Sequence, residues 1–374
     1  MRTRAAVARQ AGGPILIEDL ELDEPRRDEV LVRMIASGVC HTDAAVRDGV
    51  IPTPLPAVLG HEGAGIVEAV GADVTTVAVG DHVVLSASSC GTCRPCLRGE
   101  VAYCEHNFDI NFTGRRRDGT TTFRDADGAV GGPFFGQSSF ARYSVVLARS
   151  LVKVDRDLDL TLLAPLGCGM QTGAGAVLNE LRPEPGSTFA VIGVGAVGSA
   201  ALMSAVVSSC SRVIAVDVVD ARLDLARELG ATDVINSRRE DLLARLLEVT
   251  GGRGVDYVLS TAAIPSVLRS AADALAVRGS LALVGSSPSG TEVPFEIGES
   301  LNKGWSFRTI IQGSSVPQTF IPALIELWRR GQFPFDRLIT HYRFDDIDRA
   351  FDDSERGVAV KPVLIHDHDT EETP

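Results

Sequence analysis

The sequence predicts an α/β protein in which a doubly wound parallel sheet is combined with an irregular, β-rich domain. Three observations support this. Short β-branched runs alternate with longer helical patterns from residue 187 to about 312, and a glycine-rich turn separates the first strand from its helix. The first 165 residues instead carry Gly and Pro punctuation, short strands and a cysteine-rich loop. Alternating strands and helices favour a parallel sheet, whereas strands punctuated by Gly and Pro favour an irregular β-rich domain.

The length of the chain predicts more than one domain. A chain of 374 residues exceeds the usual size of a single hydrophobic core. We predict the β-rich domain over residues 1–169 and the parallel-sheet domain over residues 170–311. Residues 312–374 are expected to return to the first domain through a helix in TFIPALIELWRRG and a strand in VAVKPVLI. The polar, acidic tail HDHDTEETP is expected to be exposed.

Six short runs are the predicted strands of the parallel sheet. They are STFAVI (187–192), RVIAV (212–216), DVI (233–235), VDYVLS (255–260), SLALVG (280–285) and FRTII (307–311). Between them lie helical patterns such as DARLDLARELG, whose end is marked by Gly230. We expect an edge strand such as SLALVG to be able to pair across a two-fold axis, which favours a homodimer or homotetramer.

Composition and charge narrow the possible partners. Hydrophobic residues make up 45% and charged residues 23% of the chain, which is typical of a globular enzyme. The net charge of -13 repels polyanions, so we expect neither nucleic acid nor an anionic membrane as a partner. No run approaches the ~20 apolar residues of a membrane span, and the N-terminal residues lack the apolar stretch of a secretory signal. We therefore expect a cytoplasmic protein with a small-molecule substrate.

The glycine-rich turn predicts a dinucleotide site. Gly193, Gly195 and Gly198 form a GxGxxG motif directly after an apolar strand and directly before a helical run. These glycines permit a tight turn and a close approach of the backbone to a pyrophosphate at a helix N-terminus. Asp217 ends the next strand, where a carboxylate accepts hydrogen bonds from the adenosine ribose and repels the extra phosphate of NADP. NAD is therefore the predicted cofactor, and Arg222 either flanks the ribose or is a solvated helix charge.

Four of the seven cysteines form a compact array. Cys90, Cys93, Cys96 and Cys104 lie in a CxxCxxCxxxxxxxC pattern. In a reducing compartment clustered cysteines are expected to hold metal rather than to form disulfides. Four thiolates at this spacing match a closed tetrahedral zinc site, so we predict a structural zinc. A zinc ribbon that grips nucleic acid is the alternative, which the acidic chain and the absence of a basic patch around the array disfavour.

Two more cysteines and a histidine stand beside glycines: Cys40 in GVCHTD, His61 in GHEGAG and Cys168 in LGCGMQTG. Taken singly, such a cysteine is more often a packing residue than a ligand. Together, two sulfurs and one imidazole leave a tetrahedral zinc one ligand short, which is typical of a catalytic site where water or substrate completes the shell. The seventh cysteine, Cys210, lies in the helical-looking run ALMSAVVSSC and is predicted to be a buried small hydrophobe.

Taken together, these motifs resemble the zinc-containing medium-chain alcohol dehydrogenases over almost the entire chain. The run GHEGAGIVEAVGADV fits the family signature GHExxGxxxxxGxxV, and the four-cysteine lobe has the family spacing. The benzyl- or aryl-alcohol dehydrogenase branch is most similar in the segments NFTGRRRDG, GGPFFGQSSFARY, PLGCGMQTGAG, FPFDRLI and SERGVAVKPVL. The resemblance implies a Rossmann NAD-binding domain, a GroES-like catalytic domain, and two zinc ions per chain, one catalytic and one structural.

The resemblance also implies roles for individual residues. Cys40, His61 and Cys168 would bind the catalytic zinc, with Glu62 just behind it and Asp43 orienting His61. Five further residues would contact the cofactor: His41 at the pyrophosphate, Thr172, Val197 and Val284 at the nicotinamide, and Lys361 at a cofactor phosphate.

Thr42 is the predicted first proton acceptor. Its hydroxyl can accept the proton of the alcohol and pass it to the cofactor ribose. Well-known family members place a histidine three residues after this hydroxyl, whereas this chain has Ala45. We therefore expect the proton to leave by another route, such as water or His41.

The sequence thus predicts oxidation of a primary aromatic or allylic alcohol to its aldehyde with NAD. Phe134, Phe135 and Phe140 either line the substrate site or are ordinary core. Two alternatives are a thiol-dependent formaldehyde dehydrogenase of the same family and a non-catalytic NAD-binding structural protein. Intact ligands at both zinc sites disfavour the second alternative, because a degenerate relative is expected to lose the open site first.

Overall fold

The computed structural model describes residues 1–288 and 290–367. The chain forms two compact units. The first consists of Met1–Cys168, Val316–Pro322 and Asp336–Pro374, and the second of Gly169–Ser315 and Ala323–Phe335. This division differs from the sequence-based one on the C-terminal side, because helix α11 (Pro317–Arg329) begins in the first unit and ends in the second. No helix in the described part of the chain is long and apolar enough to cross a membrane.

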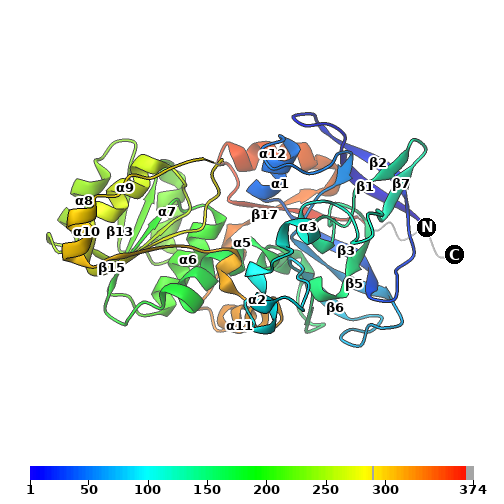
Figure 1. Ribbon diagram of the computed structural model, residues 1–374, viewed down its shortest axis with the longest axis horizontal. Coiled ribbons are helices and arrows are strands. Elements are labelled where there is room, and N and C mark those ends of the chain that lie inside the picture. The colour runs from blue at the N-terminus through cyan, green and yellow to red at the C-terminus, as the bar shows by residue number, and fades with distance from the viewer. Residues whose placement is uncertain (289, 368–374) are drawn as a thin grey trace. The chain divides into compact units, whose positions relative to one another are not determined.

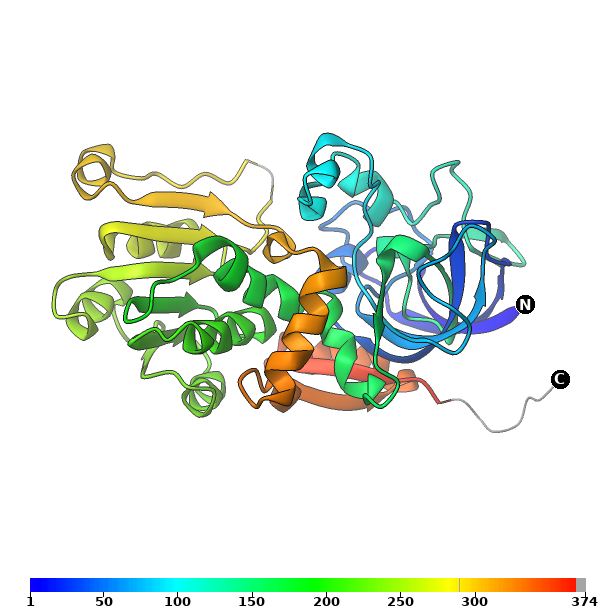
Figure 2. The same cartoon turned by 90° about the horizontal axis from the view of Figure 1, so that it is seen from below.

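The second unit is built on a six-stranded parallel sheet with the order β13-β12-β11-β14-β15-β16. Its strands are β11 (Thr188–Ile192), β12 (Arg212–Asp217), β13 (Asp233–Asn236), β14 (Val255–Ser260), β15 (Leu275–Leu283) and β16 (Ser306–Thr309). Side chains of the central strand β11 are buried throughout, as expected when helices cover both faces of a parallel sheet. Figure 2 shows the strands of this unit lying side by side with helices packed against them. The predicted doubly wound fold is confirmed.

Helices precede, connect and follow the strands of this sheet along the chain. They are α5 (Gly169–Gly175), α6 (Ala196–Val207), α7 (Asp220–Glu228), α8 (Leu242–Val249), α9 (Pro265–Asp273) and α10 (Ile297–Lys303), with a π-helix over Ala176–Leu181 and a 3₁₀ turn over Gln312–Ser314. Cys210 follows α6 instead of lying within it. It is half-buried, with its thiol 3.6 Å from the hydroxyl of Ser187, so its prediction as a buried helical residue is wrong.

The sequence predicted that the run SLALVG is an edge strand, but in the structure it is an interior strand. It is the second half of β15, which lies between β14 and β16. The first half was missed because Arg278, with φ of +64°, and Gly279 interrupt the pattern, and the register against β14 shifts between Val255 and Tyr257. The edge belongs to β16.

The first unit contains two sheets made mostly of antiparallel pairs (Figure 1). One has the order β4-β1-β2-β7-β8, with β4 (Ala57–Val58), β1 (Arg2–Ala8), β2 (Ile15–Leu22), β7 (Phe123–Asp125) and β8 (Gly128–Val130). The other has the order β10-β6-β5-β3-β18-β17, with β9 also paired to β3. Its strands are β10 (Leu151–Val154), β6 (His82–Leu85), β5 (Gly63–Val70), β3 (Glu29–Gly38), β18 (Lys361–Ile365), β17 (Ile339–Arg343) and β9 (Tyr143–Leu147).

Short helices lie between the strands of these sheets along the chain. They are α1 (His41–Arg47), α2 (Arg94–Leu97), α3 (Asn107–Asn111), α4 (Leu160–Leu163) and α12 (Ile347–Glu355), with 3₁₀ turns at Val101–Tyr103, Phe134–Gly136, Ala148–Ser150, Ala164–Gly167, Phe335–Leu338 and Phe344–Asp346. The main apolar cluster of this unit includes the fully buried rings of Phe123, Phe134, Phe140 and Phe351.

The segment after β18 departs from the predicted exposed tail. His366 is buried, with Nε2 3.0 Å from the Ser37 hydroxyl and its ring packed on Phe344. Asp367 is exposed, and residues 368–374 of the predicted tail lie outside the described residues.

Candidate active site

The first unit brings Cys40, His61 and Cys168 together. Cys40 is the N-cap of α1, His61 lies in the loop between β4 and β5, and Cys168 follows the 3₁₀ turn Ala164–Gly167. One ligand atom from each of these residues, and one carboxylate oxygen of Glu62, all lie within 4.8 Å of one another. The sequence placed these three ligands about 20 and 100 residues apart, so the fold is what makes them a site.

Asp43 links two of these ligands. As the N3 residue of α1, its carboxylate accepts a hydrogen bond from the backbone N–H of Cys40 at 3.2 Å, in a capping-box arrangement. The same carboxylate accepts from the backbone N–H of Gly60 at 3.1 Å and from Nδ1 of His61 at 2.8 Å. Because Nδ1 carries the proton, Nε2 of His61 presents its lone pair to the two sulfurs.

The side chains at this cluster fit a zinc ion. Nε2 of His61 is buried, and the described residues offer it no hydrogen-bond partner. An unsatisfied buried nitrogen is costly unless something coordinates it. The pKa of Cys40 lies well below that of an ordinary thiol, chiefly because Cys168 donates a hydrogen bond to its sulfur, although burial opposes the shift. A ready thiolate beside a lone-pair nitrogen is the donor set that zinc prefers.

Glu62 has a buried cationic partner. Both of its carboxylate oxygens accept hydrogen bonds from Nζ of Lys361 at 3.0 Å, and Lys361 also donates to the carbonyl of Val39 at 3.2 Å. Burial raises the pKa of Glu62 to about 7, although Lys361 opposes the shift. The close fit explains Gly38, since a Cβ there would lie 2.1 Å from a Glu62 oxygen. The structure therefore gives Lys361 a different partner from the cofactor phosphate expected above.

The remaining predicted residues of this region lie on α1. The hydroxyl oxygen of Thr42 lies 4.0 Å from the sulfur of Cys40. His41 is exposed at the first position of α1, and Ala45 is half-buried one turn later. Thr42 is thus placed next to the candidate metal ligands, where a hydroxyl can reach a molecule bound to them.

The four-cysteine array forms the second cluster of the first unit. The ligand atoms of Cys90, Cys93, Cys96 and Cys104 lie within 4.8 Å of one another. The sulfurs of Cys90 and Cys96, and those of Cys93 and Cys104, are 3.9 Å apart. A tetrahedral zinc with Zn–S bonds of ~2.3 Å requires sulfurs ~3.8 Å apart, so the array fits zinc closely. Backbone N–H groups point at all four sulfurs, an arrangement that favours thiolates at a metal site.

The glycine-rich turn of the second unit has the geometry that its motif predicts. Gly193 has φ of +83°, and a Cβ there would lie 2.2 Å from the hydroxyl of Thr261. A Cβ on Gly198 would lie 1.8 Å from the carbonyl oxygen of Gly193, so the third glycine lets α6 pack against the turn. Gly195, the N-cap of α6, has nothing within 4 Å of its would-be Cβ. Open space at a helix N-terminus is a cradle that suits a pyrophosphate.

Asp217 ends β12 and also stabilises this turn through hydrogen bonds. One carboxylate oxygen accepts from the backbone N–H of Val194 at 2.9 Å, and the other accepts from Val218 and Val219 at 2.7 and 3.0 Å. Nη1 of Arg222 lies 3.9 Å from Asp217. The other residues predicted at the cofactor are spread through the second unit: Thr172 is buried in α5, Val197 is half-buried in the first turn of α6, and Val284 follows β15.

An aromatic cluster adjoins the candidate metal ligands. The ring of Phe135 packs on the imidazole of His61 with centroids 4.6 Å apart, and Phe112 packs edge-on against Phe135 at 4.8 Å. Phe108, which is half exposed at 48%, stacks on Phe112 at 5.3 Å. Aromatic side chains therefore run from the imidazole toward the surface. Phe140 instead packs on Phe351 in the core, as the alternative interpretation of the phenylalanines expected.

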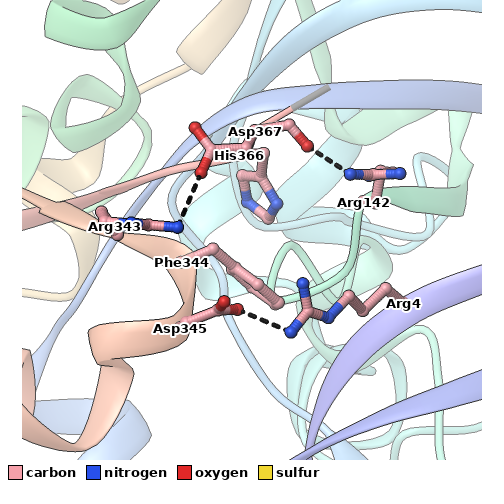
Figure 3. Close-up of a pocket in the computed structure, with 7 residues that line it drawn as sticks. All are labelled: Arg4, Arg142, Arg343, Phe344, Asp345, His366 and Asp367. Carbon is pink, nitrogen blue, oxygen red and sulfur yellow. Dashed lines mark hydrogen bonds and ion pairs between the residues drawn. The ribbon is translucent and has the colours of Figure 1, made fainter. Parts of the chain in front are cut away.

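A pocket of about 100 Å³ lies away from these ligands in the first unit (Figure 3). Its lining residues are Arg4, Arg142, Arg343, Phe344, Asp345, His366 and Asp367. The basic groups are compensated: Arg4 pairs with Asp345 at 3.0 Å, Arg343 with Asp367 at 3.6 Å, and Arg142 donates to the carbonyl of Asp367. Asp367 thus ties the end of the described chain to β17 and to Arg142, and the pair of Arg4 with Asp345 ties β1 to the turn Phe344–Asp346, so the charged groups around the pocket have structural partners.

The fold and the sites together define a class of protein. A parallel-sheet unit with a dinucleotide-type turn and a β-rich unit with an open thiol–imidazole cluster are characteristic of zinc-dependent dehydrogenases. Residues 26–156 match the family model described as alcohol dehydrogenase GroES-like domain, and residues 196–329 match that described as zinc-binding dehydrogenase. The chain belongs to the zinc-containing medium-chain alcohol dehydrogenase family, as the sequence motifs predicted.

Individual relatives are similar along their whole length. A geraniol dehydrogenase from Castellaniella defragrans is 45% identical over 364 residues, which are 97% of each chain. A crystal structure described as an alcohol dehydrogenase zinc-binding domain protein from Burkholderia ambifaria is 50% identical, with a TM-score of 0.96 over 98% of this chain and 100% of that one. The benzyl alcohol dehydrogenase of Acinetobacter calcoaceticus is 44% identical, with a TM-score of 0.95 and the same coverage.

Two features of the site escaped the sequence analysis. One is the Lys361–Glu62 pair, for which a lone lysine inside the apolar run VAVKPVLI was an available signal, because a buried lysine needs a partner. The other is the amide of Gln137, which contacts the residues around Glu62 and is treated below. Nothing in the pattern GQSSF distinguishes Gln137 from a surface residue.

Proposed function

We propose that this protein oxidises a primary aromatic or allylic alcohol to its aldehyde, with zinc at Cys40, His61 and Cys168 and with NAD as hydride acceptor. The observation that carries the proposal is the buried, unpartnered Nε2 of His61 facing two cysteine sulfurs. A zinc ion bound there would act as a Lewis acid on the alcohol oxygen. Both similar proteins named for a substrate act on such alcohols, geraniol and benzyl alcohol.

The residues around the metal ligands have separate tasks in this proposal. Asp43 holds the imidazole ring of His61 in one tautomer. Thr42 accepts the hydroxyl proton of the alcohol, since its oxygen is 4.0 Å from the sulfur of Cys40. Ala45 cannot continue a relay, so the proton leaves through water or His41. Lys361 keeps an ion pair with Glu62, which adjoins the three metal ligands.

The test of this function is a spectrophotometric panel of benzyl, cinnamyl, geranyl and short aliphatic alcohols with NAD and with NADP. We expect NADH formation that is fastest with the aromatic and allylic alcohols. Activity that appears only with formaldehyde and an added low-molecular-weight thiol would replace the proposal by a thiol-dependent formaldehyde dehydrogenase. No turnover of any alcohol by protein that binds NAD would favour a non-catalytic role.

Phe135 is proposed to favour planar substrates. Replacing Phe135 by Leu keeps an apolar side chain but removes the ring that packs on His61 and Phe112. Because an aromatic pair is worth about 0.5–1.5 kcal/mol beyond its buried area, kcat/KM for benzyl alcohol should fall roughly three- to tenfold relative to that for a short aliphatic alcohol. The control is Phe351→Leu, which removes a core ring and should leave this ratio unchanged. An unchanged ratio in Phe135→Leu would contradict the assignment.

We also propose NAD rather than NADP, bound at the glycine-rich turn with Asp217 at the ribose. Gly193, Gly195 and Gly198 would admit the pyrophosphate, Arg222 would flank the ribose, and Thr172, Val197 and Val284 would border the nicotinamide. The exposed His41 is proposed to approach the pyrophosphate. These cofactor roles follow from the family motif and from the cradle at Gly195.

Replacing Asp217 by Asn tests the cofactor choice. The change removes the charge that repels a ribose phosphate and retains an oxygen that can accept from the backbone N–H groups of the turn. We expect the preference for NAD over NADP, measured as the ratio of dissociation constants, to fall at least about tenfold, which corresponds to ~1.4 kcal/mol. Asp224→Asn on α7 is the control, since that carboxylate is 70% exposed and pairs with Arg227. Equal ratios in both variants would refute the role.

Two zinc ions per chain, a homo-oligomer and a cytoplasmic location complete the proposal. Strand β16 has one neighbour in its sheet, and apolar side chains are exposed on it and on α10, among them Phe307, Leu301 and Ile297. A second copy pairing at this edge would cover them. Sedimentation of a species near the monomer mass of 39.6 kDa would contradict this. The six cysteines assigned as thiolate ligands require a reducing compartment, which supports the cytoplasm.

A further inference from the structure

The amide of Gln137 contacts the backbone beside the candidate metal ligands without contacting a metal ligand atom. Its side chain is fully buried. The carbonyl oxygen of the amide accepts from the backbone N–H of Gly63 at 3.0 Å, and the amide nitrogen donates to the backbone carbonyl of His61 at 2.9 Å. One side chain therefore forms hydrogen bonds with the backbone on both sides of Glu62.

The same amide connects to the segment that carries Cys168. Its nitrogen also lies 3.4 Å from the carbonyl oxygen of Ser86, and the hydroxyl of Ser86 donates to the carbonyl of Gly167 at 2.7 Å. Gly167 directly precedes Cys168, and it approaches β6 so closely that a Cβ would lie 2.0 Å from the carbonyl of Leu85. Gln137 and Ser86 thus join the His61 segment to the Cys168 segment through hydrogen bonds.

The backbone around Gln137 is held in a conformation that few residues adopt. Phe135 and Ser138 have φ of +51° and +54°, in the left-handed region, although neither is glycine. The segment is kept there by the hydroxyl of Ser138, which accepts from the N–H of Phe134 and donates to the carbonyl of Val58, each at 2.7 Å. Strained backbone persists where its surroundings determine it, and such places cluster at functional sites. Here the strain turns the Gln137 amide inward and the Phe135 ring onto His61.

An amide meets both requirements of this position. The N–H of Gly63 needs an acceptor and the carbonyl of His61 needs a donor, and a neutral amide supplies both. A carboxylate would oppose two carbonyl oxygens and add negative charge beside Glu62, Asp43 and the cysteine sulfurs. An apolar side chain would leave buried polar groups unsatisfied.

We propose that Gln137 is a positioning residue for the catalytic metal, which sets the relative placement of the His61 and Cys168 ligands by fixing the backbone of both segments. The inference rests on the proposed metal role of Cys40, His61 and Cys168. Partners of this kind that orient ligands typically change metal affinity or activity by ~10–100-fold when replaced.

The test compares the unaltered protein with Gln137→Met after loading with cobalt(II) at both clusters. Two readouts are measured in each protein: the visible ligand-field absorption, and the rates at which a chelator removes metal. We expect Gln137→Met to shift the ligand-field bands of the open site and to release metal from it at least about tenfold faster. The four-cysteine cluster of the same molecule is the internal control and should release metal at an unchanged rate.

Ser138→Ala is the matched control variant. It removes a hydroxyl that holds the same strained segment but bonds neither His61 nor Gly63. The proposal would be overturned if both variants lowered the thermal stability but Gln137→Met left the metal release rate and the spectrum unchanged. Gln137 would then be a residue that only stabilises the fold. Should Gln137→Met fail to fold, Ser86→Ala, which cuts the link to Gly167, must accelerate release, and an unchanged rate there would overturn it as well. If the unaltered protein itself bound no cobalt at Cys40, His61 and Cys168, that result would instead refute the proposed function.

Discussion

Replacing Cys168 by Ala is expected to lower kcat/KM for alcohol oxidation by about four orders of magnitude or more. The change removes one of two sulfurs from a cluster whose ligand atoms lie within 4.8 Å of one another. A Lewis-acid metal supplies several kcal/mol of charge stabilisation, and each ~1.4 kcal/mol is a factor of ten in rate. Metal analysis of the variant should find one zinc per chain, retained by the four-cysteine cluster.

The specificity of this loss can be checked with the seventh cysteine. Cys210 is half-buried in the second unit and belongs to neither cluster, so Cys210→Ala should keep both metals and near-normal activity. NADH binding, followed by fluorescence, should be unchanged in Cys168→Ala because the glycine-rich turn is built by other residues. Substantial alcohol turnover by metal-depleted Cys168→Ala would show that the chemistry lies elsewhere.

Replacing Cys104 by Ala is expected to unfold the lobe around the four-cysteine cluster. The small core of this lobe consists of the four cysteines themselves, Ile110 and Leu147. So few apolar groups cannot offset the conformational entropy of ordering more than twenty residues, at roughly 1–2 kcal/mol each. Apparent binding free energies of structural zinc are ~10–16 kcal/mol in small zinc domains, comparable to the whole stability of a typical protein.

Limited proteolysis and thermal unfolding would measure this effect. We expect rapid cleavage within residues 90–112, loss of one zinc per chain, and a lower Tm in Cys104→Ala. Thr92→Ala is a suitable control, because Thr92 donates to Cys90 but is not a ligand. A protease-resistant Cys104→Ala with its original Tm would mean that the lobe folds without metal.

The parts of the fold that follow local rules were predictable from the sequence. The strands β11 to β14 stand out as short β-branched runs, and the GxGxxG turn follows from the few residues that tolerate its backbone. The first half of β15 was not predictable, because the left-handed Arg278 breaks the alternation that marks a strand.

The residues of the site likewise fall into those that a local sequence pattern predicts and those that it does not. Metal ligands could be named because Cys and His in glycine-rich runs are rare and chemically distinctive. Of the residues that support these ligands, Asp43 could be named from the family resemblance, but Gln137 and Lys361 could not, since they lie 75 and 299 positions away from Glu62 in the chain. Lys361 was instead assigned to a cofactor phosphate, as the family resemblance implied. Its burial depends on β18 pairing with β3, which no local pattern specifies.

The most direct test of the central claim is anomalous diffraction at the zinc edge from crystals of the protein as purified with zinc. The account predicts two peaks per chain. One lies amid the four cysteines, and the other lies ~2.0–2.3 Å from the sulfurs of Cys40 and Cys168 and from Nε2 of His61. A single peak at the four-cysteine cluster, in crystals of active enzyme, would contradict it.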